Sequence, residues 1–331
     1  MTHYDLKHHA IVADIGGTFA RFSRVNLADL HMDKIEIYPC AEFSSFESVL
    51  LTYQKQHSLE YVTSVAIAIA CPVMGDLIAM TNCHWQFSIQ DMKTRLGLAE
   101  FKVMNDFTAL AMCLPVLNHH HLVKIGEGSV GANQVKVVLG AGTGLGVAYL
   151  VPTQHTFRAY AGEGGHVDWG ARTEQEWFIY NYLKARYSHV SIERILSGQG
   201  LENLYQAIAL YKGLNKSPLK AAEIITLAVR QQCVIATAAV EQFFSSLGAY
   251  AGDLALTMGA FGGVYIAGGI VPRLISLIQH SEFRAQFEAK GRFTEFNALI
   301  PTYLITADQP GILGAAVSLK HSLIGEFDVV S

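Results

Sequence analysis

The chain has 331 residues, of which 51% are hydrophobic and 16% charged, and its formal net charge at pH 7 is −4. This length predicts about two domains with large apolar cores, and the composition excludes extensive disorder. The acidic balance argues against a general nucleic-acid-binding surface, and the polar first ten residues argue against a signal peptide.

The first predicted element is a hairpin between Ile11 and Val25. An apolar run enters Asp14-Ile-Gly-Gly-Thr18 and an alternating run leaves it, which is typical of a strand, a tight loop and a second strand. The same pattern returns between residues 135 and 151, around Gly140-Ala-Gly-Thr-Gly-Leu-Gly146. Two such hairpins, each opening about one domain's length of chain, predict two related α/β domains that arose by duplication.

Further apolar runs predict the remaining elements. The run 65–71, which Pro72 ends, is typical of a fully buried strand, and 101–104 predicts another short strand. After the second hairpin the pattern is mainly helical. We expect helices over 221–230 and 236–256, strands over 263–267 and 300–306, and a last helix that starts at Asp308-Gln-Pro310.

Two features bear on location. The uncharged run 254–271 could cross a bilayer by length, but its five glycines favour a helix end, a turn and a core strand. The five cysteines are widely spaced and form no CxxC pair, which indicates buried thiols rather than disulfides or a zinc site. We therefore expect a cytoplasmic protein without a membrane partner.

The two glycine-rich loops could bind phosphate. Glycine lets consecutive backbone N–H groups converge on an anion, and Thr18 and Thr143 add hydroxyl donors. A carboxylate beside phosphate, such as Asp14, would require a Mg²⁺ ion between them. The alternative is that each loop is only a tight β-hairpin, and the presence of two matched loops weakens that alternative.

Asp106 follows an apolar strand, in Met104-Asn-Asp-Phe-Thr-Ala109, at the point where a helix begins. It could simply be the N-cap of that helix. In an α/β domain, however, ligands bind at the carboxyl ends of strands, and a helix N-terminus keeps a carboxylate ionised. Such a group could align a hydroxyl and accept its proton late in phosphoryl transfer.

A third group of polar residues lies in Gly162-Glu-Gly-Gly-His-Val-Asp168. A glutamate between glycines is exposed on a loop that approaches other groups closely. Glu163 and His166 together offer acceptors and a donor for neighbouring hydroxyls of a polyol. Glu193 could supply one more acceptor, although an isolated glutamate in that position could equally be a surface residue.

These motifs resemble the bacterial glucokinase family, the hexokinase-like branch of the actin/Hsp70-type ATP-binding fold, over nearly the whole chain. The chain lacks the Cys-rich zinc loop of related sugar kinases, and Phe19 stands where the family commonly has Asn. The motifs also include a segment from Cys71-Pro72 through Met80-Thr-Asn82 to Phe87-Ser88, and Phe261-Gly-Gly-Val-Tyr-Ile-Ala-Gly-Gly-Ile-Val-Pro-Arg273.

The resemblance implies a two-domain actin-like ATPase fold (a duplicated ribonuclease H-like fold) with an interdomain cleft. Residues 1–111 with 311–331 would form the small domain, and residues 112–310 the large domain with helical insertions. The implied activity is transfer of phosphate from ATP, with Mg²⁺, to the 6-hydroxyl of glucose. The implied assembly is a homodimer.

The resemblance also implies roles for individual residues. Asp106 would be the general base, and Asp14 would hold Mg²⁺, directly or through water. The sugar hydroxyls would bind Asn105, Glu163, His166 and Glu193. The nucleotide would bind Ala13, Asp14, Ile15, Gly16, Gly17, Thr18, Gly142, Thr143, Gly144, Gly268 and Gly269.

Three other functions fit parts of the pattern. A kinase for mannose, an amino sugar or another hexose differs only in pocket polarity, which the sequence does not rank. A non-catalytic sugar-sensing regulator would need a DNA-reading module, for which we expect no room before Ile11. An actin-like filament or chaperone ATPase would not need the Glu163 and His166 loop.

Overall fold

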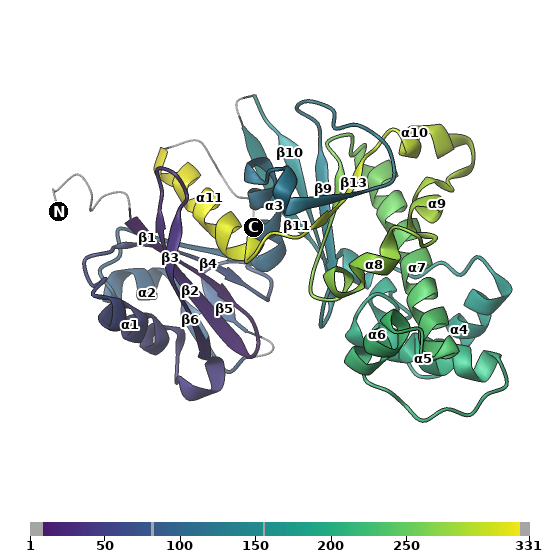
Figure 1. The fold of residues 1–331 in the computed structure, drawn as a ribbon. Coiled ribbons are helices and arrows are strands. Elements are labelled where there is room, and N and C mark those ends of the chain that lie inside the picture. Colours follow the sequence, from purple (N-terminus) through teal and green to yellow (C-terminus); the bar gives the residue numbers. More distant parts are fainter. Residues whose placement is uncertain (1–8, 81–82, 155, 325–331) are drawn as a thin grey trace. The chain divides into compact units, whose positions relative to one another are not determined.

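The computed structural model describes residues 9–80, 83–154 and 156–324, and the chain divides into two compact units (Figure 1). The first unit takes the segments Met1–Leu117, Ala148–Ala161 and Ala307–Ser331, and the second takes Asn118–Val147 and Gly162–Thr306. Residues 81 and 82 of the Met80-Thr-Asn82 motif lie outside the described residues.

The first unit contains a five-stranded sheet of order β3-β2-β1-β4-β7. β1 pairs antiparallel with β2 and parallel with β4, and β4 pairs parallel with β7. The predicted first hairpin is therefore confirmed, as is the strand over 101–104. The strand predicted over 65–71 is also present, but it ends two residues earlier, at Ile69. The strand bounds are β1 His9–Ile15, β2 Phe19–Asn26, β3 Met32–Pro39, β4 Ser64–Ile69 and β7 Glu100–Asn105; β5 Leu77–Ala79 and β6 Gln86–Ser88 form a separate pair.

Helices cover both faces of this sheet because its strands alternate between two apolar cores. In β1, Ile11 packs in one core with Phe46 and Leu50 of α1, whereas Val12 packs in the other with Ile312 of α11. The helices are α1 Phe46–His57, α2 Ile89–Arg95, α3 Asp106–Cys113 and α11 Pro310–Ile324, the last beginning at Pro310 as predicted.

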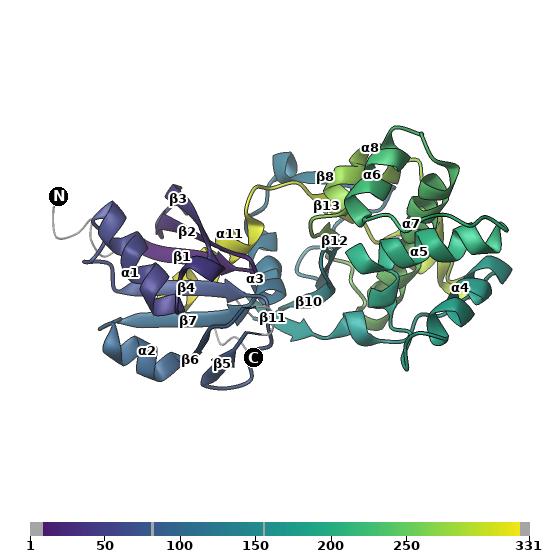
Figure 2. The same ribbon diagram turned by 90° about the horizontal axis from the view of Figure 1, so that it is seen from below.

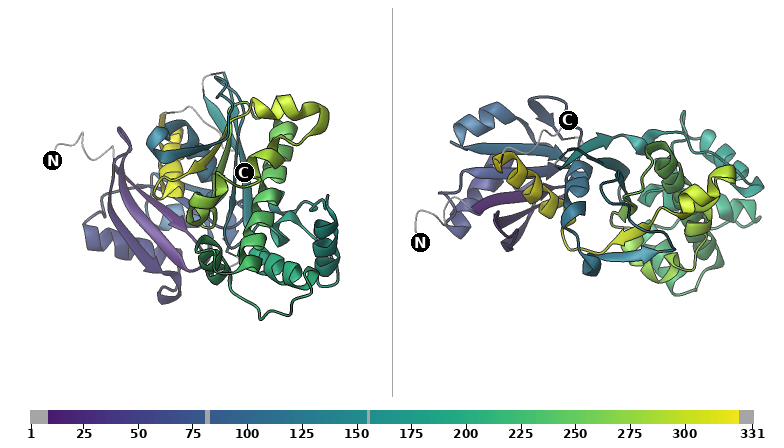
Figure 3. Two further views of the ribbon diagram at one scale, coloured as in Figure 1. Left: turned by 45° about the vertical axis from the view of Figure 1, so that its right-hand side comes forward. Right: turned by 90° about the horizontal axis from the view of Figure 1, so that it is seen from above.

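α11 packs closely on α3, as both panels of Figure 3 show. A Cβ on Gly314 of α11 would lie 1.7 Å from the carbonyl oxygen of Ala109 on α3, so only glycine permits this approach. The contact fixes α3, whose first residue is Asp106. The packing of the last helix thus bears directly on a predicted catalytic residue.

A second sheet has six strands in the order β11-β10-β9-β12-β13-β8. Its strands β8, β9, β12 and β13 belong to the second unit, whereas most of β10 and β11 falls in the segment Ala148–Ala161, which is assigned to the first. β12 is parallel to β9 and to β13. The strands are β8 Leu122–Ile125, β9 Lys136–Ala141, β10 Leu145–Pro152, β11 Phe157–Gly162, β12 Val264–Ala267 and β13 Thr302–Ile305. The order β11-β10-β9-β12-β13 repeats the order β3-β2-β1-β4-β7, which agrees with the predicted duplication.

The helices of the second unit surround the long helix α7, which packs against α5, α6 and α9 (Figure 2). The helices predicted over 221–230 and 236–256 are confirmed. After α7 the chain turns at Gly259, whose φ is +57°, and enters β12. The bounds are α4 Glu174–Lys184, α5 Gly198–Tyr211, α6 Ala221–Val229, α7 Val234–Met258, α8 Ile275–Ile278, α9 Phe283–Glu288 and α10 Thr294–Ala298.

Among the described residues no single helix is long and apolar enough to span a membrane. The pair α6 and α7 passes such a test together by length and composition, but the two helices are bent by 102° at their junction. Most of α7 is buried inside the protein itself.

Candidate active site

The first glycine-rich loop joins β1 to β2 in the first unit. The Gly16 N–H donates to the Phe19 carbonyl at 3.0 Å, and the Thr18 carbonyl accepts from the Cys40 N–H at 2.8 Å. The loop is thus a tight hairpin held from both sides. Phe19, which stands where the glucokinase family commonly has Asn, is 43% exposed.

Asp14 lies at the end of β1, opposite Arg21 in the hairpin register. Their side chains form an ion pair at 3.9 Å, and 30% of the Asp14 side chain is exposed. A Cβ on Gly311, in the first turn of α11, would lie 3.5 Å from the Asp14 carboxyl carbon. Burial raises the pKa of Asp14, and Arg21 partly offsets that effect.

Asp106 is the first residue of α3 and is partly buried. Its pKa is raised to about 6, mainly by burial and to a lesser extent by the neighbouring charge of Asp14. Hydrogen bonds to the carboxylate, including one from the Phe107 N–H at 3.0 Å, act in the opposite direction. The first unit therefore brings two predicted site carboxylates into one electrostatic environment.

The N-cap of α3 is Asn105, so the capping role considered for Asp106 belongs to its neighbour. Asn105 has an extended backbone, and its Oδ1 accepts from the N–H groups of Phe107 at 2.9 Å and Thr108 at 3.3 Å. Its Nδ2 donates to the Cys71 carbonyl at 3.3 Å. Because Asn105 caps the helix, Asp106 is not the N-cap, and its carboxylate lies in the first turn of α3.

The second glycine-rich loop, Gly142 to Gly144, joins β9 to β10 in the second unit. The Gly142 N–H donates to the Gly144 carbonyl at 2.8 Å. The Leu145 N–H, at the end of the loop, donates to Oε2 of Glu193 at 2.9 Å. A predicted sugar-binding carboxylate is thus in direct contact with a predicted phosphate loop.

Gly268 and Gly269 follow β12 and lie beside the end of β9. A Cβ on Gly268 would come within 2.4 Å of the Ala141 carbonyl oxygen, and the φ of Gly268 is +86°. The Ile270 N–H donates to that same carbonyl at 3.3 Å. The second unit therefore places the predicted nucleotide-binding turn, Gly268 with Gly269, next to Ala141, which precedes Gly142.

The predicted sugar loop begins at the end of β11 and forms a single 3₁₀ turn, Gly164–His166. The side chains of Glu163 and His166 are 68% and 61% exposed, and Nε2 of His166 lies 4.0 Å from Oε2 of Glu163. The Tyr250 hydroxyl of α7 donates to the Gly164 carbonyl at 2.6 Å. A ring nitrogen of His189 lies 2.8 Å from the His166 carbonyl.

Glycine is required in this loop because other groups occupy the space of its side chains. A Cβ on Gly164 would lie 2.6 Å from the Tyr250 hydroxyl, and one on Gly165 would lie 2.2 Å from the Leu145 carbonyl oxygen. The loop is therefore held between α7 and the start of β10. This support leaves the Glu163 and His166 side chains exposed.

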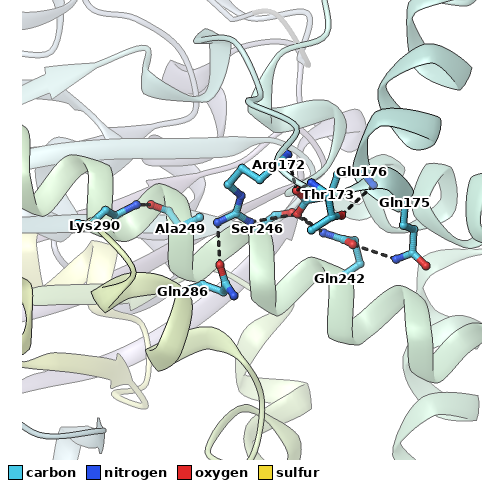
Figure 4. A network of polar contacts seen from close by, with 9 residues as sticks. All are labelled: Arg172, Thr173, Gln175, Glu176, Gln242, Ser246, Ala249, Gln286 and Lys290. Atoms are coloured by element: carbon cyan, nitrogen blue, oxygen red, sulfur yellow. Dashed lines mark hydrogen bonds and ion pairs between the residues drawn. The ribbon is translucent and has the colours of Figure 1, made fainter. Parts of the chain in front are cut away.

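A buried polar network follows the sugar loop at the start of α4 (Figure 4). Glu176, whose side chain is only 2% exposed, accepts from the Arg172 guanidinium at 3.0 Å and from Gln242 at 2.8 Å. Arg172 also donates to Gln286 at 2.8 Å. The network connects α4 with α7 and α9. None of its residues is among the predicted site residues, although the Thr173-x-x-Glu176 capping box is a local signal of the start of α4.

The site residues thus fall into two groups, one in each unit. The first unit brings together Ala13, Asp14, Ile15, Gly16, Gly17, Thr18, Asn105 and Asp106. The second unit brings together Gly142, Thr143, Gly144, Glu163, His166, Glu193, Gly268 and Gly269. The described residues contain no group of three or more His, Cys, Asp or Glu side chains placed to hold a metal ion.

Comparisons with known proteins identify the relatives of the chain. A model of the glucokinase family matches residues 11–322. Glucokinases of Escherichia fergusonii and Salmonella arizonae are each 44% identical to the chain over 317 residues, which are 95% of this chain and 98% of the relative.

Solved structures agree. A glucokinase from an Antarctic psychrotroph has a TM-score of 0.86 and 34% identity, covering 94% of this chain and 98% of that one. A glucokinase of the ROK family (repressors, open reading frames and kinases) from Streptomyces griseus, in complex with glucose and AMPPNP, has a TM-score of 0.63. It is 18% identical and covers 93% of this chain and 98% of that one, a likeness that concerns the fold, which is the predicted actin-like ATPase fold. With a family model and close relatives that span nearly its whole length, the chain belongs to the glucokinase family.

Proposed function

We propose that the chain phosphorylates glucose at its 6-hydroxyl with ATP, and that Asp106 is the general base. The observation that carries this role is the environment of Asp106, at the N-terminus of α3 with a pKa of about 6. A carboxylate of that pKa is ionised at neutral pH and is more basic than an ordinary aspartate. It can align the hydroxyl and accept its proton as the phosphoryl group is transferred.

The remaining sugar hydroxyls are assigned to Asn105, Glu163, His166 and Glu193. Glu163 and His166 are exposed on a loop whose backbone is fixed from two sides, which gives them defined positions without burying them. The Oε2 of Glu193 is engaged by Leu145, and Oε1 is the oxygen that we assign to the sugar. Fixed acceptors of this kind discriminate between epimers because a misplaced hydroxyl leaves a polar group unpaired.

ATP is assigned to the two glycine-rich loops and the turn after β12. A Cβ on Gly142 or on Gly269 would have no other described atom beyond its chain neighbours within 4 Å, so phosphate or nucleotide atoms have room there. Backbone N–H groups of such loops bind phosphate oxygens. This assignment includes Ala13 to Thr18, Gly142 to Gly144, and Gly268 with Gly269.

Mg²⁺ is assigned to Asp14. Asp14 and Asp106 are carboxylates whose pKa values burial raises, and the Arg21 guanidinium is 3.9 Å from Asp14. The carboxylate oxygens of Asp14, directly or through water, suit a hard cation that is also held by phosphate. When bound, Mg²⁺ supplies positive charge that neutralises the phosphate groups.

The central experiment is a coupled assay of glucose-dependent ADP formation with the full chain. Asp106→Asn should lower kcat by at least about 100-fold, because general base catalysis contributes that much or more. The matched control is Asp91→Asn, which changes an exposed aspartate in the first turn of α2 and should leave kcat unchanged. Full activity of the folded Asp106→Asn variant would refute the assigned role.

The same assay decides between the remaining candidates. A panel of glucose, mannose and amino sugars, compared by kcat/KM, tests the assignment to glucose against other hexoses. Absence of turnover with all sugars, together with salt-sensitive binding to duplex DNA, would favour a regulator. We also propose that the enzyme is a cytoplasmic homodimer, which sedimentation equilibrium and cell fractionation can test.

A further inference from the structure

Glu193, which we assign to the sugar, also contacts the proposed phosphate loop of the second unit. Its Oε2 accepts from the Leu145 N–H at 2.9 Å, across 48 residues of sequence. The Glu193 backbone is fixed as well, because its carbonyl accepts from the Ser197 hydroxyl at 2.8 Å. The carboxylate therefore forms a fixed link between the turn Ile192–Arg194 and the start of β10.

The two glycines of this loop have opposite surroundings. A Cβ on Gly144 would lie 2.6 Å from Oε2 of Glu193, which is closer than real Cβ contacts allow. A Cβ on Gly142 would have no other described atom beyond its chain neighbours within 4 Å. Neither residue has a positive φ, so backbone strain does not explain either glycine. Gly144 is thus needed for the Glu193 carboxylate, whereas Gly142 is open to a ligand.

Two more contacts tie the same loop to its surroundings. The Gly198 N–H, at the start of α5, donates to the Gly142 carbonyl at 2.9 Å. On the other side, Gly165 of the sugar loop approaches the Leu145 carbonyl so closely that a Cβ would lie 2.2 Å away. Both peptide groups of Leu145 therefore face the proposed sugar site: Glu193 accepts from its N–H, and Gly165 lies against its carbonyl.

We propose that Glu193 couples the sugar site to the second phosphate loop, by binding the sugar and at the same time positioning Gly144 and Leu145 for the nucleotide. The inference rests on the proposed function, because it assumes that Glu193 binds glucose. Any shift of the carboxylate on sugar binding changes its hydrogen bond to Leu145. Coupling of this kind is reciprocal, so a change at Gly144, which faces the carboxylate, alters sugar affinity and a change at Glu193 alters nucleotide affinity.

The first test measures nucleotide affinity in the absence of sugar. MgAMPPNP is titrated into wild type, Glu193→Ala and His166→Ala by calorimetry. Glu193→Ala leaves the Leu145 N–H without this acceptor, and we expect binding about fivefold weaker or more, the lower end of typical coupling. His166→Ala is the matched control, because the His166 side chain pairs with Glu163. It should bind the nucleotide within about twofold of wild type.

Glu193→Gln provides a rescue. The amide oxygen of glutamine has the same reach and can accept from the Leu145 N–H, so nucleotide affinity without sugar should return to nearly the wild-type value. A contribution of Glu193 only to overall folding would instead show as a lower Tm in the alanine variant, with nucleotide affinity unchanged.

The second test measures glucose affinity in the absence of nucleotide. Gly144→Ala displaces the Glu193 carboxylate and should weaken glucose binding by about fivefold or more. Gly142→Ala, in the same loop, should leave glucose affinity unchanged, whatever it does to ATP. Circular dichroism and Tm confirm that each variant is folded; if Gly144→Ala is not, the Glu193 series carries the test.

The outcomes separate this inference from the proposed function. If Glu193→Ala binds MgAMPPNP as wild type does, or Gly144→Ala binds glucose as wild type does, the coupling is refuted although the enzyme is still a glucose kinase. If wild type neither binds nor phosphorylates glucose, the proposed function itself fails. Weaker binding in both expected variants, with both controls unaffected, supports the coupling.

Discussion

Replacing Asp106 with asparagine should stabilise the folded protein while it removes activity. The carboxyl has a pKa of about 6 in the folded chain, against an ordinary pKa of 3.8 for aspartate, so the folded state binds this proton more tightly than the unfolded state. One pKa unit corresponds to about 1.4 kcal/mol. The difference of about 2.2 units therefore means that ionised Asp106 lowers the free energy of unfolding by about 3 kcal/mol.

The effect has a defined pH dependence. Below pH 3.8 Asp106 is protonated in both the folded and the unfolded state, so it does not lower the free energy of unfolding. Between pH 3.8 and 6 the folded state holds more protons than the unfolded state, so the contribution of this group to stability falls as pH rises. Above pH 6 the full cost is present. Asparagine is neutral at every pH and can still accept from the Phe107 N–H, so Asp106→Asn removes the cost without removing that hydrogen bond.

The assay is thermal and urea unfolding of wild type and Asp106→Asn at pH 4 and pH 8, without nucleotide or Mg²⁺. We expect the variant to gain about 3 kcal/mol, or roughly 5 °C in Tm, at pH 8 and very little at pH 4. Asp91→Asn serves as the control for the loss of a negative charge at a helix N-terminus. Equal stability of wild type and Asp106→Asn at pH 8, or the same gain at both pH values, would refute the reasoning.

Three further predictions concern activity and stability. At saturating glucose, kcat/KM for ATP should fall about tenfold per pH unit below pH 6, as Asp106 becomes protonated. Asp14→Asn should move this acidic fall in kcat/KM to lower pH, because a neighbouring negative charge is gone, and an unchanged pH dependence would contradict the prediction. Tyr250→Phe should raise KM for glucose severalfold with KM for ATP unchanged, whereas Tyr265→Phe, which loses a similar bond to a glycine carbonyl, should leave KM for glucose unaltered. Glu176→Ala should cost about 3 kcal/mol in urea unfolding, since it leaves buried donors unpaired, and a loss under 1 kcal/mol would show that the network contributes little.

Much of the fold could be predicted because its signals are local. The hairpin of β1 and β2 follows from an apolar run, the glycines Gly16 and Gly17, and an alternating run, which all lie in one short stretch of sequence. The last helix follows from Pro310, which has no N–H to lose in a first turn. Such features depend on the conformation of a few consecutive residues, which the residue types themselves restrict.

Which residue caps α3 could not be predicted in the same way. Asn105 and Asp106 are adjacent, and both residue types are good N-caps. Which of them caps the helix depends on which one has an extended backbone, and that is set by where β7 ends and how α11 packs on α3. The sequence pattern allows either residue as the cap, and in the structure the cap is Asn105.

The contacts that support the site could not be predicted either, because they join residues far apart in the chain. The Tyr250 hydroxyl and the Gly164 carbonyl are separated by 86 residues, and no local pattern on α7 marks that tyrosine among the other buried aromatic residues. Glu176 is the exception. Its capping box with Thr173 is a local signal, and only its burial and its contact with Gln242 required the structure.

The glycines of the site show why a glycine-rich loop alone does not define a phosphate site. Gly142 has open space where a side chain would be, and this is what a loop that binds an anion through its backbone requires. Gly144 and Gly165 are glycines for a different reason, because the Glu193 carboxylate and the Leu145 carbonyl occupy that space. A motif search treats all three alike. Their surroundings separate the glycine that leaves room for a ligand from the two that hold the loops in place, so alanine at Gly142 tests ligand binding and alanine at Gly144 tests the support behind it.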